Sequence, residues 1–153
     1  MEDTNTKSLD EIGLKYTYDF GKRKTYTGGD KTSMGHNFTE RYDQLFQKIR
    51  FDSIKFLELG VFYGKSLVMW SDYFPNGHIY GIDISLKRYN ESIDTLKRHG
   101  AFKNNNISVF EQDITSDDFK DFLNTLPDFD VIVDDAAIIL IANTITLLYY
   151  TKN

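Results

Sequence analysis

The chain has 153 residues, enough for one compact domain, and 18 basic against 23 acidic side chains give it a formal net charge of −5. This acidic balance argues against a nucleic-acid partner bound on a broad basic surface, and the absence of cysteine excludes disulfides, thiolate metal sites and cysteine nucleophiles. The polar start and the lack of an apolar run of about 20 residues predict neither a signal peptide nor a membrane span, so we expect a cytoplasmic protein.

Residues 1–37 show little apolar periodicity and are expected to form an irregular N-terminal arm. The segment 38–49 places apolar side chains at the spacing of one helix face. From residue 53 onward, short apolar runs alternate with helical segments. We expect strands at 54–59, 78–82, 107–110 and 129–133, and helices at 64–74, 86–99 and 116–126, the last capped by Ser116.

Strands that alternate with helices predict an α/β fold with a Rossmann-like parallel sheet and flanking helices. In such sheets, ligands bind beyond the carboxyl ends of the strands. Each expected strand ends there in an acidic residue or a glycine. In chain order these are Glu58 with Gly60, Asp83, Asp113, and Asp134 with Asp135. We therefore expect residues 38–135 to form one binding domain with its ligand at this edge.

The segment LELGVFYGKS, residues 57–66, resembles a nucleotide phosphate loop but lacks its spacing. Gly-Lys-Ser at 64–66 would require a glycine at position 59, which is Leu, and Glu58 would repel a triphosphate. A dinucleotide loop requires Gly-x-Gly-x-x-Gly, and no glycine lies between Gly60 and Gly64. These departures disfavour an ATPase or kinase, and also an NAD-linked oxidoreductase.

Asp83 lies 23 residues after Gly60, at the end of the second expected strand. A carboxylate there accepts hydrogen bonds from ribose hydroxyls. A ribose acceptor without a pyrophosphate loop indicates S-adenosylmethionine (SAM). Glu-x-Gly-x-x-x-Gly followed by this aspartate resembles the class I SAM-dependent methyltransferases. The resemblance implies cofactor contacts from Glu58, Gly60, Gly64 and Asp83, and adenine contacts from Gln112 and Asp113.

A narrower resemblance covers about residues 9–135. The segments GDKTSMGHNFTERY, residues 29–42, and FLELGVFYGKSLVMWSDYFPNGHIYGIDIS, residues 56–85, are similar to macrolide-sugar O-methyltransferases of the mycinamicin and macrocin type, a group related to cephalosporin-hydroxylase-like proteins. The resemblance implies that the early segment folds over the cofactor, which makes Lys31 and His36 candidate pocket residues. It further implies that Asp134 and Asp135 hold Mg²⁺, which orients the hydroxyls of a sugar or polyol acceptor.

Residues 136–153, AAIILIANTITLLYYTKN, depart from the family pattern, which continues Gly/Ala-Ser-His and supplies a catalytic-site histidine. We expect an apolar tail that lies outside the family, with an uncovered sheet edge beside it. A shifted reading frame permits Asp-Asp-x-Ser-His in register, which suggests a truncated or frameshifted chain that the gene sequence would test. The favoured hypothesis is a SAM-dependent O-methyltransferase. The alternative is a non-catalytic SAM-fold module whose tail docks a partner or a second copy to form a homo-oligomer.

Overall fold

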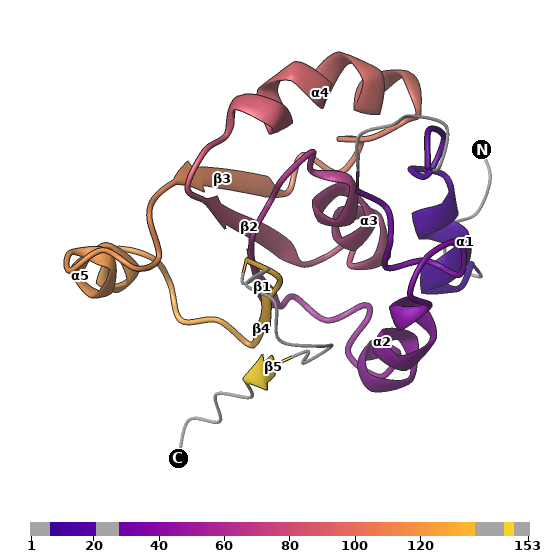
Figure 1. The fold of residues 1–153 in the computed structure, drawn as a ribbon. Coiled ribbons are helices and arrows are strands. Elements are labelled where there is room, and N and C mark those ends of the chain that lie inside the picture. The colour runs from indigo at the N-terminus through magenta and orange to yellow at the C-terminus, as the bar shows by residue number, and fades with distance from the viewer. Residues whose placement is uncertain (1–6, 21–27, 137–145, 149–153) are drawn as a thin grey trace.

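A computed structural model describes residues 7–20, 28–136 and 146–148, and its central feature is a sheet of order β3-β2-β1-β4-β5 (Figure 1). Neighbours among β1 to β4 pair in parallel, and β5 pairs antiparallel with β4. The strands are β1 (Lys55–Leu59), β2 (His78–Asp83), β3 (Ile107–Glu111), β4 (Val131–Asp134) and β5 (Thr146–Leu148). The helices are α1 (Leu9–Leu14), α2 (Phe38–Phe46), α3 (Lys65–Tyr73), α4 (Lys87–Arg98) and α5 (Phe119–Asn124). This arrangement confirms the predicted α/β class and Rossmann-like sheet.

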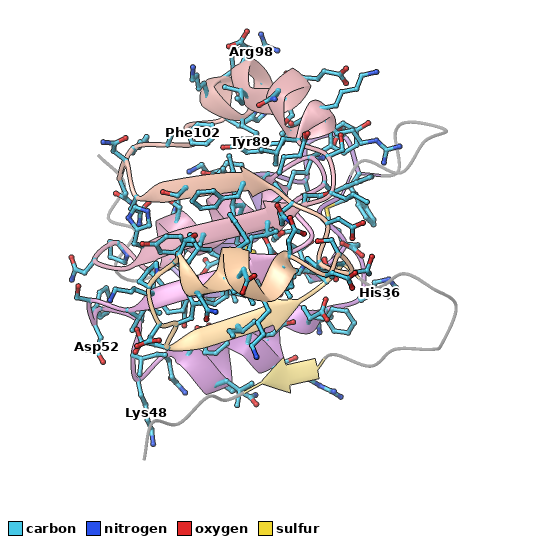
Figure 2. All side chains as sticks on the ribbon, turned by 90° about the vertical axis from the view of Figure 1, so that its left-hand side faces the viewer. His36, Lys48, Asp52, Tyr89, Arg98 and Phe102 are labelled. Atoms are coloured by element: carbon cyan, nitrogen blue, oxygen red, sulfur yellow. The ribbon has the colours of Figure 1, made fainter. Side chains whose placement is uncertain are left out.

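Helices cover both faces of the sheet. Figure 1 shows α1, α2 and α3 on one side and α5 on the other. Helix α4 presents its buried side chains Tyr89, Ser92 and Leu96 inward. Tyr89 packs edge-on against Phe102 beneath α4, with ring centroids 6.5 Å apart (Figure 2).

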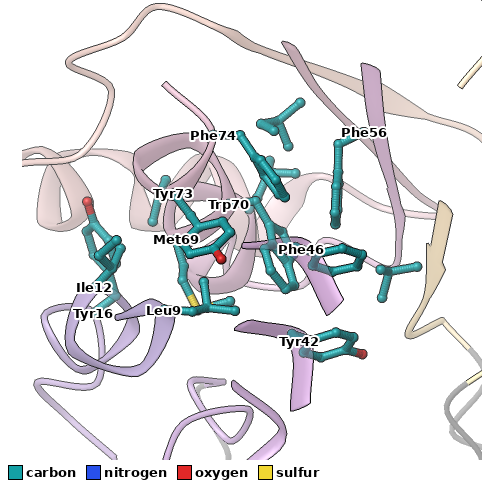
Figure 3. Close-up of a cluster of buried hydrophobic side chains, with 14 of the residues drawn as sticks. Leu9, Ile12, Tyr16, Tyr42, Phe46, Phe56, Met69, Trp70, Tyr73 and Phe74 are labelled. Atoms are coloured by element: carbon teal, nitrogen blue, oxygen red, sulfur yellow. The ribbon is translucent and has the colours of Figure 1, made fainter. Parts of the chain in front are cut away.

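A cluster of buried hydrophobic side chains lies between the sheet and the layer of α1, α2 and α3 (Figure 3). Trp70 of α3 is fully buried, and its ring centroid lies 4.8 Å from that of Phe56 and 6.0 Å from that of Phe46. Such aromatic contacts each add about 0.5–1.5 kcal/mol to the stabilisation from burial. The loop between β1 and α3 is connected to packed elements at both ends. This packing therefore fixes the position of the loop.

The prediction of an irregular arm was wrong for residues 9–14, which form α1. Ser8 caps this helix reciprocally with Glu11: the Ser8 hydroxyl accepts from the Glu11 amide at 3.2 Å, and the Ser8 amide donates to the Glu11 carboxylate at 2.8 Å. The arm also packs closely on the domain. A Cβ at Gly13 would lie 2.7 Å from the Met69 sulfur, so a larger residue here would force the Met69 side chain to move.

The other predicted elements are present with shifted ends. The helix expected at 116–126 is the shorter α5, and Ser116 does not cap it, because its hydroxyl donates to the Asp113 carbonyl at 2.6 Å. The segment 38–49 is helical as α2 only to Phe46, and β4 begins at Val131 rather than at 129.

The predicted tail, 136–153, falls largely outside the described residues. Its part at Thr146–Leu148 forms β5, which pairs Thr146 with Asp134 and covers the β4 edge. The prediction that this edge is uncovered was therefore wrong. Within the described ranges, no helix is long and apolar enough to cross a membrane.

Candidate cofactor site

A cavity of about 320 Å³ opens at the carboxyl ends of the parallel strands. Its size falls within the range of about 300–1,000 Å³ typical of small-molecule sites. Three parts of the chain form most of its walls: the arm at residues 13 and 28–32, the loop and helix at residues 60–63, 65–66 and 69, and the strand ends at residues 82–84, 114 and 135–136. The sequence predicted this edge of the sheet as the ligand site.

The loop between β1 and α3 depends on two glycines. Gly60 has φ 89°, and a Cβ there would lie 2.9 Å from the backbone nitrogen of Ala136. Gly64 has φ 75°, and a Cβ there would lie 2.5 Å from the Tyr89 ring. Both positions therefore require glycine, for backbone conformation and for space. The turn brings backbone to the cavity wall, where a ligand can approach it closely.

Phe62 adopts a left-handed conformation, φ 53°, in the middle of this loop. For a residue with a side chain, this conformation costs about 1–2 kcal/mol. A hydrogen bond and a cation–π contact are among the interactions that hold Phe62 in place. Its amide donates to Asp83 at 2.8 Å, and the Arg88 guanidinium of α4 lies 4.7 Å from its ring centroid.

Asp83 joins the end of β2 to this loop. One carboxylate oxygen accepts hydrogen bonds from the amides of Val61 at 2.7 Å and Phe62 at 2.8 Å, and the other accepts from the Ser85 amide at 3.1 Å. The sequence predicted Asp83 as a ribose acceptor but did not predict that it also shapes the loop. Each carboxylate oxygen can accept more than one hydrogen bond, so both roles are compatible.

Lys31 inserts its ammonium between two strand ends. It forms an ion pair with Asp135 after β4, and its Nζ lies 3.6 Å from the Glu58 carboxylate on β1. Burial opposes the charge on Lys31, but the nearby carboxylates of Glu58 and Asp135 outweigh it and raise its pKa. These interactions between Lys31 and the two carboxylates hold the arm against β1 and β4 at the centre of the sheet.

Glu58 is fully buried behind the cavity wall. The Trp70 indole nitrogen donates to its carboxylate at 3.2 Å. Burial raises the pKa of Glu58, and the Lys31 ammonium offsets this only in part. The predicted cofactor residue Glu58 therefore supports Lys31 and α3 from behind rather than lining the cavity.

Lys65, Ser66, Ile84 and Ile114 also line the cavity, although sequence reasoning assigned them no role. Their positions in the sequence could have identified them as cavity residues. Ile84 directly follows Asp83, Ile114 follows the third strand, and the first residues of α3 follow the glycine loop. All of them therefore lie at the ligand-binding edge of a parallel sheet.

The predicted site residues separate into three groups. Lys31, Gly60, Asp83 and Asp135 lie in the cavity wall, and Glu58 and Gly64 support it from behind. The other four do not line it, and their roles stay predictions. The His36 side chain is 59% exposed at the surface (Figure 2), Gln112 donates to Ser116, Asp113 accepts from Thr115, and Asp134 accepts from the Ala136 amide.

Four parallel strands in the order β3-β2-β1-β4, with a glycine loop after β1 and an aspartate closing β2, have the fold of the class I SAM-dependent methyltransferases. No family model matches the chain. Among solved structures it is similar to the MycE methyltransferase of the mycinamycin biosynthetic pathway, in complex with Mg, SAH and mycinamycin VI. The TM-score is 0.56 at 26% identity, over 86% of this chain and 28% of that one.

Two curated relatives show the similarity at the level of the sequence. The chain is 32% identical over 110 residues to mycinamicin VI 2''-O-methyltransferase of Micromonospora griseorubida, covering 67% of this chain and 25% of that one. It is 28% identical over 143 residues to L-olivosyl-oleandolide 3-O-methyltransferase of Streptomyces antibioticus, covering 86% and 30%. The chain therefore spans less than a third of the length of these relatives. The predicted resemblance is confirmed: the chain has the class I methyltransferase fold and is related to the macrolide O-methyltransferases.

Proposed function

We propose that the cavity binds S-adenosylmethionine and that the protein transfers its methyl group to a hydroxyl of a sugar or another small hydroxylated molecule. The observation that carries this proposal is the junction of Asp83 with the glycine loop in the wall of one cavity. The named activities of the relatives support the choice of a hydroxyl acceptor.

The cavity offers a matching surface to each part of a nucleoside sulfonium. Asp83 presents a carboxylate for the ribose hydroxyls. Ile84 and Ile114 present apolar surfaces suited to a flat adenine ring. Gly60 presents backbone to the cavity, and its lack of a side chain lets the Ala136 backbone lie beside it. We infer that these residues bind and orient the cofactor, with Phe62 and Arg88 keeping the loop in shape.

When bound, SAM supplies a methyl group on a positively charged sulfur. Transfer forms a carbon–oxygen bond to the acceptor as the carbon–sulfur bond breaks, and the hydroxyl proton leaves to a base. The described residues supply proximity and orientation. Neither His78, which bonds Ser108 at 2.9 Å, nor His99, which stacks on Tyr18, lines the cavity, so we assign neither as the base.

Asp134 and Asp135 remain the proposed magnesium ligands, but the described residues do not complete a metal site. Mg²⁺ needs only one or two protein carboxylates because it keeps several waters. Asp135, however, pairs with Lys31, and one Asp134 oxygen accepts from the Ala136 amide. No group of three potential ligands occurs within the described residues. We therefore derive no step through a metal.

The test of cofactor binding is calorimetry of S-adenosylhomocysteine (SAH) with the 153-residue chain. We expect binding in the parent chain and its loss in Asp83→Ala. Asp83→Asn keeps a carbonyl oxygen for the loop amides and should bind weakly, which separates loop shape from ribose recognition. Asp94→Ala, at an exposed position on α4, is the matched control. A folded parent chain that ignores SAH would refute the proposal.

Self-association through residues 138–150 also stays a proposal, because most of that segment lies outside the described residues. Sedimentation velocity of the chain, with and without the substitution Leu148→Asp, measures it directly. We expect a dimer in the parent chain and a monomer in the variant.

A further inference from the structure

The strand ends that carry the proposed magnesium ligands already hold a cation, the Lys31 ammonium. It forms an ion pair with Asp135 directly after β4, and its Nζ lies 3.6 Å from Glu58 Oε1 on β1. Within the described part of the chain, no other cation pairs with either carboxylate. Lys31 lines the cavity, although its side chain is only 7% exposed. The ammonium therefore already uses one of the two carboxylate oxygens that Asp135 could offer to a metal ion.

The backbone of Lys31 is fixed by the helices beside it. Its carbonyl accepts a hydrogen bond from the Thr39 amide of α2 at 3.0 Å. The Thr39 hydroxyl in turn donates to the Asp10 carboxylate of α1 at 2.7 Å. Because the backbone is held in this way, the ammonium stays close to Asp135 without help from a ligand.

The two carboxylates that Lys31 contacts differ in their access to solvent. Glu58 is fully buried, so its charge needs a compensating cation inside the protein. The Asp135 side chain is 51% exposed, so dissolved ions can reach it. Asp134 beside it is a further carboxylate, with one oxygen accepting from the Ala136 amide at 3.0 Å. A dissolved cation can therefore approach Asp135, where it meets the charge of Lys31.

We propose that the Lys31 ammonium is the resident cation of this site and competes with a divalent ion for Asp135. The inference rests on the part of the proposed function that assigns Mg²⁺ to Asp134 and Asp135. Like charges repel at close range, so the ammonium lowers the affinity of Asp135 for a metal ion. Without it, the site gains one negative charge and a free carboxylate oxygen, and Mg²⁺ binds through such oxygens. A metal ion thus binds tightly only when Lys31 leaves Asp135.

Titration with Mn²⁺, a paramagnetic substitute for Mg²⁺, measures this competition in the absence of SAM. Electron paramagnetic resonance of free Mn²⁺ gives the affinity, and broadening of amide signals in the ¹⁵N-labelled chain locates the ion. We expect weak binding in the parent chain. Lys31→Met should bind Mn²⁺ about tenfold to hundredfold more tightly, with broadening centred on residues 134–136. Lys97→Met, at an exposed position on α4, is the control and should bind as the parent does.

A second variant guards against unfolding of Lys31→Met, which leaves Glu58 buried without its cation. Lys31→Met with Glu58→Gln removes that uncompensated charge and should show the same gain in Mn²⁺ affinity, because Asp135 is free in both. Mg²⁺ should also raise the melting temperature of this double variant more than that of the parent chain, since an ion that binds only the folded state stabilises it. Adding Asp135→Asn should abolish both effects.

Equal Mn²⁺ affinity in the parent chain and in the Lys31 variants would overturn the inference, because the ammonium would then not compete with the metal. This holds whether all of them bind the ion tightly or none of them binds it. A gain that persists after Asp135→Asn would also overturn it, because the ion would then lie elsewhere. SAH binding by the same preparations shows separately whether the proposed cofactor site holds.

Discussion

Replacement of Gly64 by alanine tests how closely the glycine loop between β1 and α3 packs against α4. Alanine in the left-handed conformation that Gly64 adopts, φ 75°, costs about 1–2 kcal/mol. The new Cβ would also lie 2.5 Å from the Tyr89 ring, and relieving such overpacking costs about 1–3 kcal/mol more. The expected loss is about 2–5 kcal/mol, a large share of the total stability of about 5–15 kcal/mol for a small domain.

Gly100 provides a matched control, because it shares the backbone conformation but not the contact. Its φ is 82°, and a Cβ there would meet only the flexible ends of Lys15 and Lys103, at 3.5 Å. Gly100→Ala should therefore cost only the conformational part, about 1–2 kcal/mol. Urea denaturation of both variants gives the comparison. Equal losses for the two variants would refute the claim that Tyr89 confines the loop.

Three further predictions concern stability. Tyr42→Phe should reduce the fall in the free energy of unfolding between pH 10 and 12 by about 2 kcal/mol, measured by urea denaturation. Burial raises the pKa of Tyr42 from 10.0 to about 12, so the folded state holds this proton longer and loses stability as the pH rises through that window. A fall as steep as in the parent chain would contradict this. Lys31→Met should cost about 3–5 kcal/mol, because Glu58 is left buried without its cation, and adding Glu58→Gln should recover much of the loss; no recovery would contradict the pairing. Ser8→Ala should lower the thermal stability by about 1 kcal/mol through loss of the α1 cap, and an unchanged melting temperature would argue against that cap.

The sheet could be predicted from local patterns, whereas much of the site could not. Each parallel strand appears in the sequence as a short apolar run, and Gly60 and Asp83 could be placed at strand ends by counting residues. Helix α1 was missed even though Ser8 and Glu11 have the spacing of a capping box, because its apolar stripe is short. Its packing on α3 depends on Gly13, whose role appears only in three dimensions.

Long-range contacts explain the remaining differences. In the sequence, Lys65 stands in a Gly-Lys-Ser segment that lacks the spacing of a phosphate loop. Its ion pair with Asp19 could not be predicted, because Asp19 lies 46 residues earlier in the chain. Asp83 could be assigned a ligand from its position but not its bonds to the loop amides. Ser116 has the residue type of a helix cap, yet the turn after Asp113 takes its hydroxyl and the helix begins later. In each case a contact with another residue, near or distant in the sequence, determined the structure instead of the local sequence preference.

The most direct test of the central claim is a map of amide chemical shifts in the ¹⁵N-labelled chain during titration with S-adenosylhomocysteine. The account predicts saturable changes at Gly60, Phe62, Ser66 and Ile84, which line the cavity, with α2 amides such as that of Leu45 unaffected. Saturable changes confined to the α1–α2 surface, or no change in a folded chain, would contradict a cofactor site at the carboxyl ends of the strands.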